Sequence, residues 1–225
     1  MISAVVRYQA ALLLRSYRWV PPVLLYAAVM AIGVAGGDPL LSSFAWAAAA
    51  IMPTAVWLTR VAVTVEPAAA RHTTSAAVGP GRAHLAALLV ALGGSGLLAA
   101  ACTGALAAGT DRIANHATHG VSRGEAIAAG AVAQLVTILA GVAIGALTNR
   151  PVLRRPAYAV PPAALATLAA LITPGTPTAR VLKVVTDAAG NDKVDLPTLQ
   201  LAITAGVFVV AVAATCRLAA RVEHD

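Results

Sequence analysis

Gly93-Gly94-Ser95-Gly96 has the residue types of a catalytic serine site. It matches the G-x-S-G arrangement around the nucleophile of some intramembrane serine proteases. Such a serine needs a base to take its hydroxyl proton, normally a histidine on another membrane span. None of the five histidines lies inside an apolar run. We therefore interpret these small residues as positions where helices approach closely.

His116 and His119 could place two imidazoles on one face of a helix and so bind a metal. Zinc sites use three or four protein ligands, and only Asp111 and Glu125 lie nearby in the sequence. A polar loop is the simpler interpretation, and a metal site is the alternative.

The residues needed for ion-coupled transport and for nucleotide hydrolysis are absent from the sequence. Ionisable groups inside spans mark ion or proton paths, but the apolar runs contain only Gln134 with scattered Ser and Thr, and Arg60 and Glu125 lie at the edges of runs. This pattern argues against an ion-coupled transporter. The sequence also has no Walker A pattern, so it does not bind and hydrolyse a nucleotide by itself. We expect neither an enzyme nor a bound cofactor.

The composition predicts a multi-pass membrane protein. The chain has 225 residues, of which 59% are hydrophobic and 11% charged, whereas about 25% are charged in an average soluble protein. Several apolar runs approach the roughly 20 residues that a spanning helix needs. The net charge of +7 comes without a basic cluster interleaved with aromatics, so nucleic acid is not an expected partner. Cys102 and Cys216 form no spaced framework.

The fold class expected is all-α, with one transmembrane domain over residues 1–225. Six apolar runs predict six spans, at Trp19–Gly36, Leu41–Val63, Leu85–Ala108, Glu125–Leu147, Tyr158–Thr173 and Leu199–Cys216.

The orientation follows from the basic residues of the loops. With both termini in the cytoplasm, eleven of the sixteen Lys and Arg residues are inside and five are outside. The inner ones are Arg7, Arg15, Arg18, Arg60, Arg71, Arg82, Arg150, Arg154, Arg155, Arg217 and Arg221, and the outer ones are Arg112, Arg123, Arg180, Lys183 and Lys193. The bias to Arg, Ala and Gly is typical of a GC-rich bacterial genome, so we expect a bacterial cytoplasmic membrane.

Residues 1–18 are expected to form an interfacial amphipathic helix. On a helical wheel Arg7, Arg15 and Arg18 fall within an arc of about 80°. Val5 and Leu13 lie on the other side, so the arginines would face anionic headgroups. A disordered basic leader that only sets topology is the alternative.

Two pairs of glycines have the small-residue spacing that favours close helix packing. They are Gly33 with Gly37 and Gly141 with Gly145. They could serve packing within the chain or a seam between two copies.

Two loops are more than connectors. In residues 66–82, Glu66-Pro67 predicts a helix start and Gly79-Pro80-Gly81 a stop, with a short helix over Ala68–Val78 between them. In residues 174–198, apolar spacing predicts a short helix over 178–189 that lies at or dips into the outer surface. A solvated loop is the alternative there.

The order of these features resembles the transmembrane subunits of type-2 ABC exporters. The resemblance covers essentially the whole chain, from VRYQAALLLRSYRW through six spans, and it includes the second-to-third-span loop with Glu66, the Ala68–Val78 helix, the Gly79 turn and Arg82. The loop is richer in alanine and proline than is usual in that family, which leaves homodimer or heterodimer open.

The resemblance implies a permease that moves an apolar or amphipathic substrate such as a drug, antibiotic, peptide or lipid out of the cell. Cytoplasmic ABC ATPase subunits would supply ATP and Mg²⁺, and a second or related permease and membrane lipids would be further partners. Glu66, Arg71, Gly79 and Arg82 would form the ATPase-coupling loop. The alternative is a non-transporting regulatory or immunity protein that binds a lipid or peptide.

Overall fold

The computed structural model describes residues 2–34, 38–109, 121–153, 156–189 and 196–222. Within these ranges every regular element is a helix, which confirms the all-α class. The helices are α1 (Ile2–Ser16), α2 (Val20–Gly33), α3 (Leu40–Thr64), α4 (Ala68–Val78), α5 (Pro80–Gly109), α6 (Arg123–Leu147), α7 (Pro156–Ile172), α8 (Pro177–Ala188) and α9 (Thr198–Val222).

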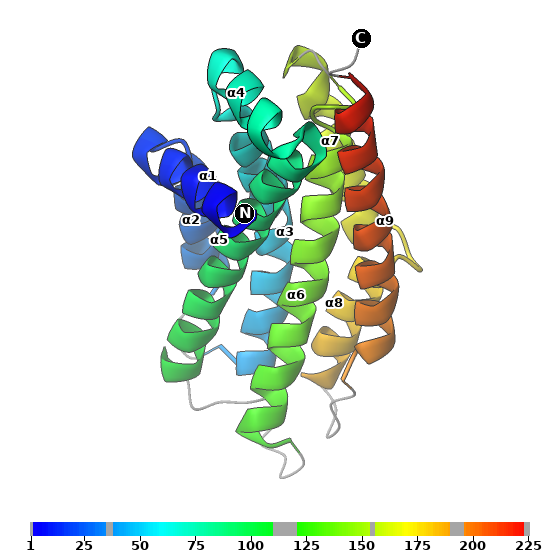
Figure 1. Cartoon of the computed structure of the whole chain (residues 1–225). Helices are drawn as coiled ribbons and strands as arrows, with labels where there is room; N and C mark the ends of the chain where they lie inside the picture. Colours follow the sequence, from blue (N-terminus) through cyan, green and yellow to red (C-terminus); the bar gives the residue numbers. More distant parts are fainter. Residues whose placement is uncertain (1, 35–37, 110–120, 154–155, 190–195, 223–225) are drawn as a thin grey trace.

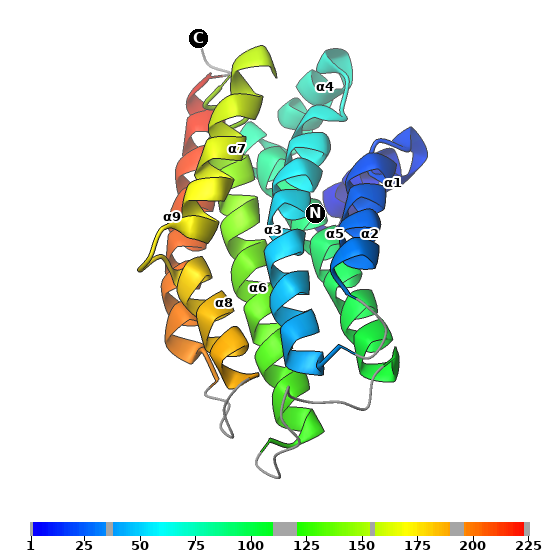
Figure 2. The same cartoon turned by 180° about the vertical axis from the view of Figure 1, so that it is seen from behind.

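The long helices run roughly side by side in one bundle (Figures 1 and 2). Helices α3 and α6 form its centre, since 67% and 61% of their most apolar windows are buried, against 17% for α9. Helix α4 and the end of α9 lie at the same end of the bundle, and α1 packs obliquely against α5 (Figure 1). We call this end the α4 end.

Four helices are long and apolar enough to cross a membrane: α3, α5, α6 and α9. The bent pair α7–α8 gives a fifth candidate if it is one span. The expected first span, Trp19–Gly36, contains only the 14-residue helix α2. At about 1.5 Å per residue this helix is roughly 21 Å long, short of the hydrocarbon thickness of about 30 Å. Apolar composition alone therefore overestimated the helical length at this position.

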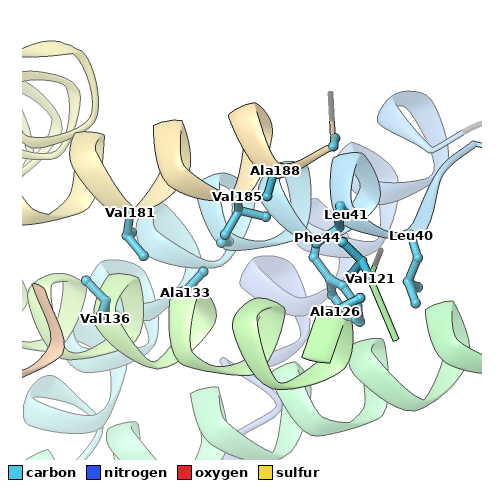
Figure 3. Packing of buried hydrophobic residues seen from close by; sticks show 12 residues of the cluster. Leu40, Leu41, Phe44, Val121, Ala126, Ala133, Val136, Val181, Val185 and Ala188 are labelled. Carbon is cyan, nitrogen blue, oxygen red and sulfur yellow. The ribbon is translucent and has the colours of Figure 1, made fainter. Parts of the chain in front are cut away.

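The largest buried cluster joins α3, α6 and α8 (Figure 3). Phe44 on α3, Val136 on α6, and Val181 and Val185 on α8 are each fully buried. Large side chains from three helices exclude lipid and water here. The position of α8 is thereby fixed by the core.

The helix expected over 178–189 is present as α8 (Pro177–Ala188), and it packs against α3, α6 and α9. It bends by 43° from α7 across a short break. At the break Gly175 has φ +98°, the hydroxyl of Thr176 donates to Ala170 O at 2.6 Å, and Thr178 donates to the same carbonyl. Both threonine hydroxyls thus satisfy the carbonyl of Ala170 beside the bend.

The helix expected in the loop after Glu66 has the predicted bounds, Ala68–Val78. Gly79 follows it with φ +86°, a region that favours glycine. Helix α5 then begins directly at Pro80, whereas the sequence interpretation placed the next span at Leu85. Proline is favourable in a first helical turn because its missing N–H would have no helical partner, so Pro80 starts a helix as well as stopping one.

A candidate polar site at the α4 end

A cavity of about 360 Å³ lies at the α4 end, where α1, α3, α4, α5 and α9 meet. Its walls combine alanine and valine side chains with polar ones. The polar and charged lining residues are Gln9, Glu66, Arg71, His72, Ser75, His84 and Arg150. Such a mixed lining between helices is the usual setting of a ligand site.

Glu66 is the buried acid of this cavity, with only 5% of its surface exposed. Its Oε2 accepts a hydrogen bond from Gln9 Nε2 at 2.8 Å, and its Oε1 accepts one from Thr74 Oγ1 at 2.7 Å. A buried carboxylate is tolerated only when its oxygens have such donors. Glu66 therefore connects α1, the end of α3 and α4.

In the sequence, Glu66-Pro67 predicts the start of α4. In the structure the N-cap of α4 is Pro67, with no side-chain cap. The Glu66 carboxylate instead lies along the side of α4, where it accepts from Thr74 two turns further on. It is a link between helices rather than a cap.

Helix α1 brings the donor to Glu66 through its buried face. Val5, Gln9 and Leu13 are its buried residues and follow one another at spacings of four. Arg7 and Arg15 are exposed, as the amphipathic pattern predicts. The amide of Gln9 was missed in the sequence, although a polar residue in the middle of an apolar stripe is a usable sign of a buried partner.

Tyr8 lies beside the same acid. Desolvation, followed by the negative charge of the nearby Glu66 carboxylate, raises the pKa of Tyr8 above its ordinary value.

Arg71 lines the cavity and also contacts the start of α4. One guanidinium nitrogen, Nη2, donates to Glu66 O at 3.0 Å, which fixes the side chain against the start of α4. Its Nε is buried and has no hydrogen-bond partner among the described residues. Arg150, from the segment after α6, lines the same cavity. The cavity thus combines two guanidinium groups with one carboxylate.

The other residues of the expected coupling loop lie elsewhere. Gly79 ends α4, and Arg82 is exposed in the first turn of α5, outside the cavity lining. His84, one turn into α5, does line the cavity, and its Nε2 is buried without a partner in the described part of the chain.

The glycines expected at helix contacts are found as follows. A Cβ on Gly141 would lie 2.7 Å from Met52 O, and one on Gly145 would lie 2.6 Å from Thr59 Cβ, so α6 approaches α3 closely at both. Gly33 lies against the indole of Trp46. Gly37, like His116 and His119, lies outside the described residues.

Ser95 is fully buried in α5, and its hydroxyl has no partner among the described residues. The described residues also contain no group of three or more His, Cys, Asp or Glu side chains placed to hold a metal ion.

Comparison with known proteins gives no family for the chain: no family model, no curated protein and no solved structure matches it.

Proposed function

We propose that this chain is the membrane-spanning permease subunit of an ATP-driven ABC exporter. It moves an apolar or amphipathic substrate out of a bacterial cell, with ATP hydrolysis supplied by a separate ATPase chain. The proposal includes six spans and both termini in the cytoplasm. The short helix α2 is part of the first crossing, and the broken α7–α8 pair forms the fifth.

The observation that carries this proposal is the outward face of α4. Six residues of α4 are exposed: Ala68, Ala69, His72, Thr73, Ala76 and Ala77. Ala68 and His72 also border the cavity, and the other four lie at spacings of three and four along the helix. They form one face of small and polar side chains. A face that rested on lipid would need large apolar residues, whereas a small-residue face allows close insertion between the side chains of a protein partner.

The way α4 is held also supports a role in coupling. The buried Glu66 carboxylate links α4 to α1 through Gln9, and Arg71 fixes the first turn. A movement imposed on α4 by a partner would therefore be passed to the bundle as a rigid-body movement. A freely hinged loop would absorb such a movement instead.

Site-specific crosslinking tests the proposal. A photoreactive amino acid replaces Ala69 or Ala76 on α4, with Ala108 at the other end of α5 as the matched control. All three positions are exposed. In cells of the source organism, the two α4 positions should give a crosslinked product whose partner contains a Walker A motif, and the Ala108 position should not.

The purified crosslinked assembly should also hydrolyse ATP. An α4 position that crosslinks only to lipid, or to a protein without a nucleotide-binding motif, would contradict the assignment of this chain as an exporter subunit.

A further inference from the structure

The cavity at the α4 end contains unused hydrogen-bonding capacity. Arg71 Nε, His84 Nε2 and Gln9 Oε1 are buried and have no partner among the described residues, and all three residues line the cavity. Gln9 is 97% buried, since 3% of its surface is exposed. Buried polar atoms are normally paired, by protein, water or ligand, so three at one cavity point to an occupant.

The size of the cavity indicates more than a single water molecule. A water occupies about 30 Å³ in the liquid, and the cavity measures about 360 Å³. This volume lies within the usual range of small-ligand sites, which begins near 300 Å³. A polar group of several heavy atoms would fit.

The charges of the lining residues determine the sign of charge that the bound group should have. Arg71 and Arg150 contribute two positive charges and Glu66 one negative charge, with the histidines counted as neutral. Both Glu66 oxygens already accept hydrogen bonds, so the acid is satisfied within the protein. The remaining single positive charge matches a monoanion, and guanidinium groups pair especially well with phosphate oxygens.

The position of the cavity in the molecule indicates which phosphate-containing compound it would bind. It lies at the end of the apolar bundle, beside α1, whose exposed residues include the apolar Leu14 and the cationic Arg7 and Arg15. Helices with this mixture lie at the boundary between acyl chains and headgroups. A phosphodiester at that depth belongs to a phospholipid.

We propose that this cavity binds the headgroup of an anionic phospholipid of the phosphatidylglycerol type. The phosphodiester pairs with Arg71 and Arg150, and a headgroup hydroxyl donates to the free acceptor of Gln9. The bound lipid thereby fills the space under α4. The inference does not depend on an ATPase partner.

Native mass spectrometry of the purified full-length chain, delipidated in detergent and titrated with single lipids, tests the proposal. Phosphatidylglycerol should bind at least about ten-fold more tightly than phosphatidylcholine. The double variant R71Q/R150Q should lose this preference. R7Q, which removes an exposed charge on α1 outside the cavity lining, should retain it.

A single variant tests the proposal even if the double variant does not fold. Arg150 is exposed, so R150Q alone should keep the wild-type melting temperature and lose about three-fold in phosphatidylglycerol affinity. Equal binding of both lipids to the wild type, or unchanged affinity in a folded double variant, would overturn the proposal.

Free inorganic phosphate and glycerol phosphate separate the two possible sources of the anion. At concentrations matched to the lipid they should fail to displace phosphatidylglycerol. Full displacement would assign the cavity to a soluble anion. No ATPase is present in these titrations, so their outcome is independent of the crosslinking result.

Discussion

Gln9 Nε2 donates a 2.8 Å hydrogen bond to Glu66 Oε2, and the two residues are 57 positions apart in the chain. Gln9 lies on the buried stripe of α1, and Glu66 lies between the central helix α3 and helix α4. This one bond therefore joins α1 to the segment between α3 and α4 at the α4 end of the bundle.

Replacing Gln9 with leucine should loosen α1. The substitution removes one donor from a buried carboxylate, which costs about 1–3 kcal/mol when the acceptor is left unpaired. The melting temperature should fall, and amide exchange along α1 should accelerate. Ala11→Leu, at an exposed position of the same helix, is the control. Identical melting and exchange for the two variants would show that the bond does not hold α1.

Close contact of α3 and α6 should make Gly141 intolerant of even one methyl group. In Gly141→Ala the new Cβ would lie 2.7 Å from the backbone oxygen of Met52, and overpacking of this kind typically costs about 1–3 kcal/mol.

Gly93 on α5 is the matched control, because no atom lies within 4 Å of a Cβ placed there. Gly93→Ala should stabilise the helix by up to about 1 kcal/mol. The two variants should thus shift the unfolding midpoint in opposite directions. Equal shifts would contradict the packing described for α3 and α6.

Four of the spans could be predicted from the sequence because α3, α5, α6 and α9 are each long and apolar. The bounds of α4 could be predicted too, since Pro67 and Gly79 punctuate the chain on either side of it. The break between α7 and α8 could be predicted as well, since the sequence indicates an apolar run that ends at Thr173 and a separate helix over 178–189. The packing of α8 against α3, α6 and α9 could not, because local spacing does not show which helices meet.

The polar site was only partly predictable for a different reason. Glu66 and Arg71 stand out in the sequence because they lie in a capped loop between apolar runs. Gln9 and Arg150 complete the cavity only through the way α1 and the segment after α6 pack at the bundle end. That packing depends on tertiary structure, so a local sequence pattern does not predict it.

The exposed face of α4 offers a cleaner test of coupling than Glu66 and Arg71, because those two residues also hold the structure together. Ala76→Arg should enlarge the outward face without disturbing buried atoms. It should weaken retention of the ATPase captured by crosslinking at least ten-fold, about 1.4 kcal/mol.

Ala220→Arg makes the same change at an exposed position near the end of α9 and should leave retention unchanged. Co-purification and ATP hydrolysis of the two variants measure the difference. Normal retention and coupling in Ala76→Arg would remove α4 from the ATPase interface.

Reporter fusions should give the topology. A reporter after Asp225 and one within 149–155 should both be cytoplasmic, and one between Ala188 and Asp192 should be external. These results follow from six crossings with both termini inside and the Arg-rich loops in the cytoplasm. An external reporter at the C-terminus would exclude the six-span arrangement.

The last prediction concerns Thr173, which is exposed in the break between α7 and α8. If these helices form one broken span, Thr173 lies at membrane depth and faces lipid. A cysteine there stays a thiol, whereas reaction with a water-soluble maleimide requires the thiolate and access to water. Thr173→Cys, in a C102A/C216A background, should therefore remain unlabelled in intact membranes and react after unfolding in detergent.

Leu196→Cys in the same background is the control, since this exposed residue lies just before α9 at the opposite end of the bundle from α4. It should be labelled from outside in intact membranes. If Thr173→Cys reacts from outside as fast as Leu196→Cys, then α8 is an element of the outer surface that re-enters the protein. The fifth crossing would in that case have to be made by α7 alone, whose 17 residues span only about 26 Å.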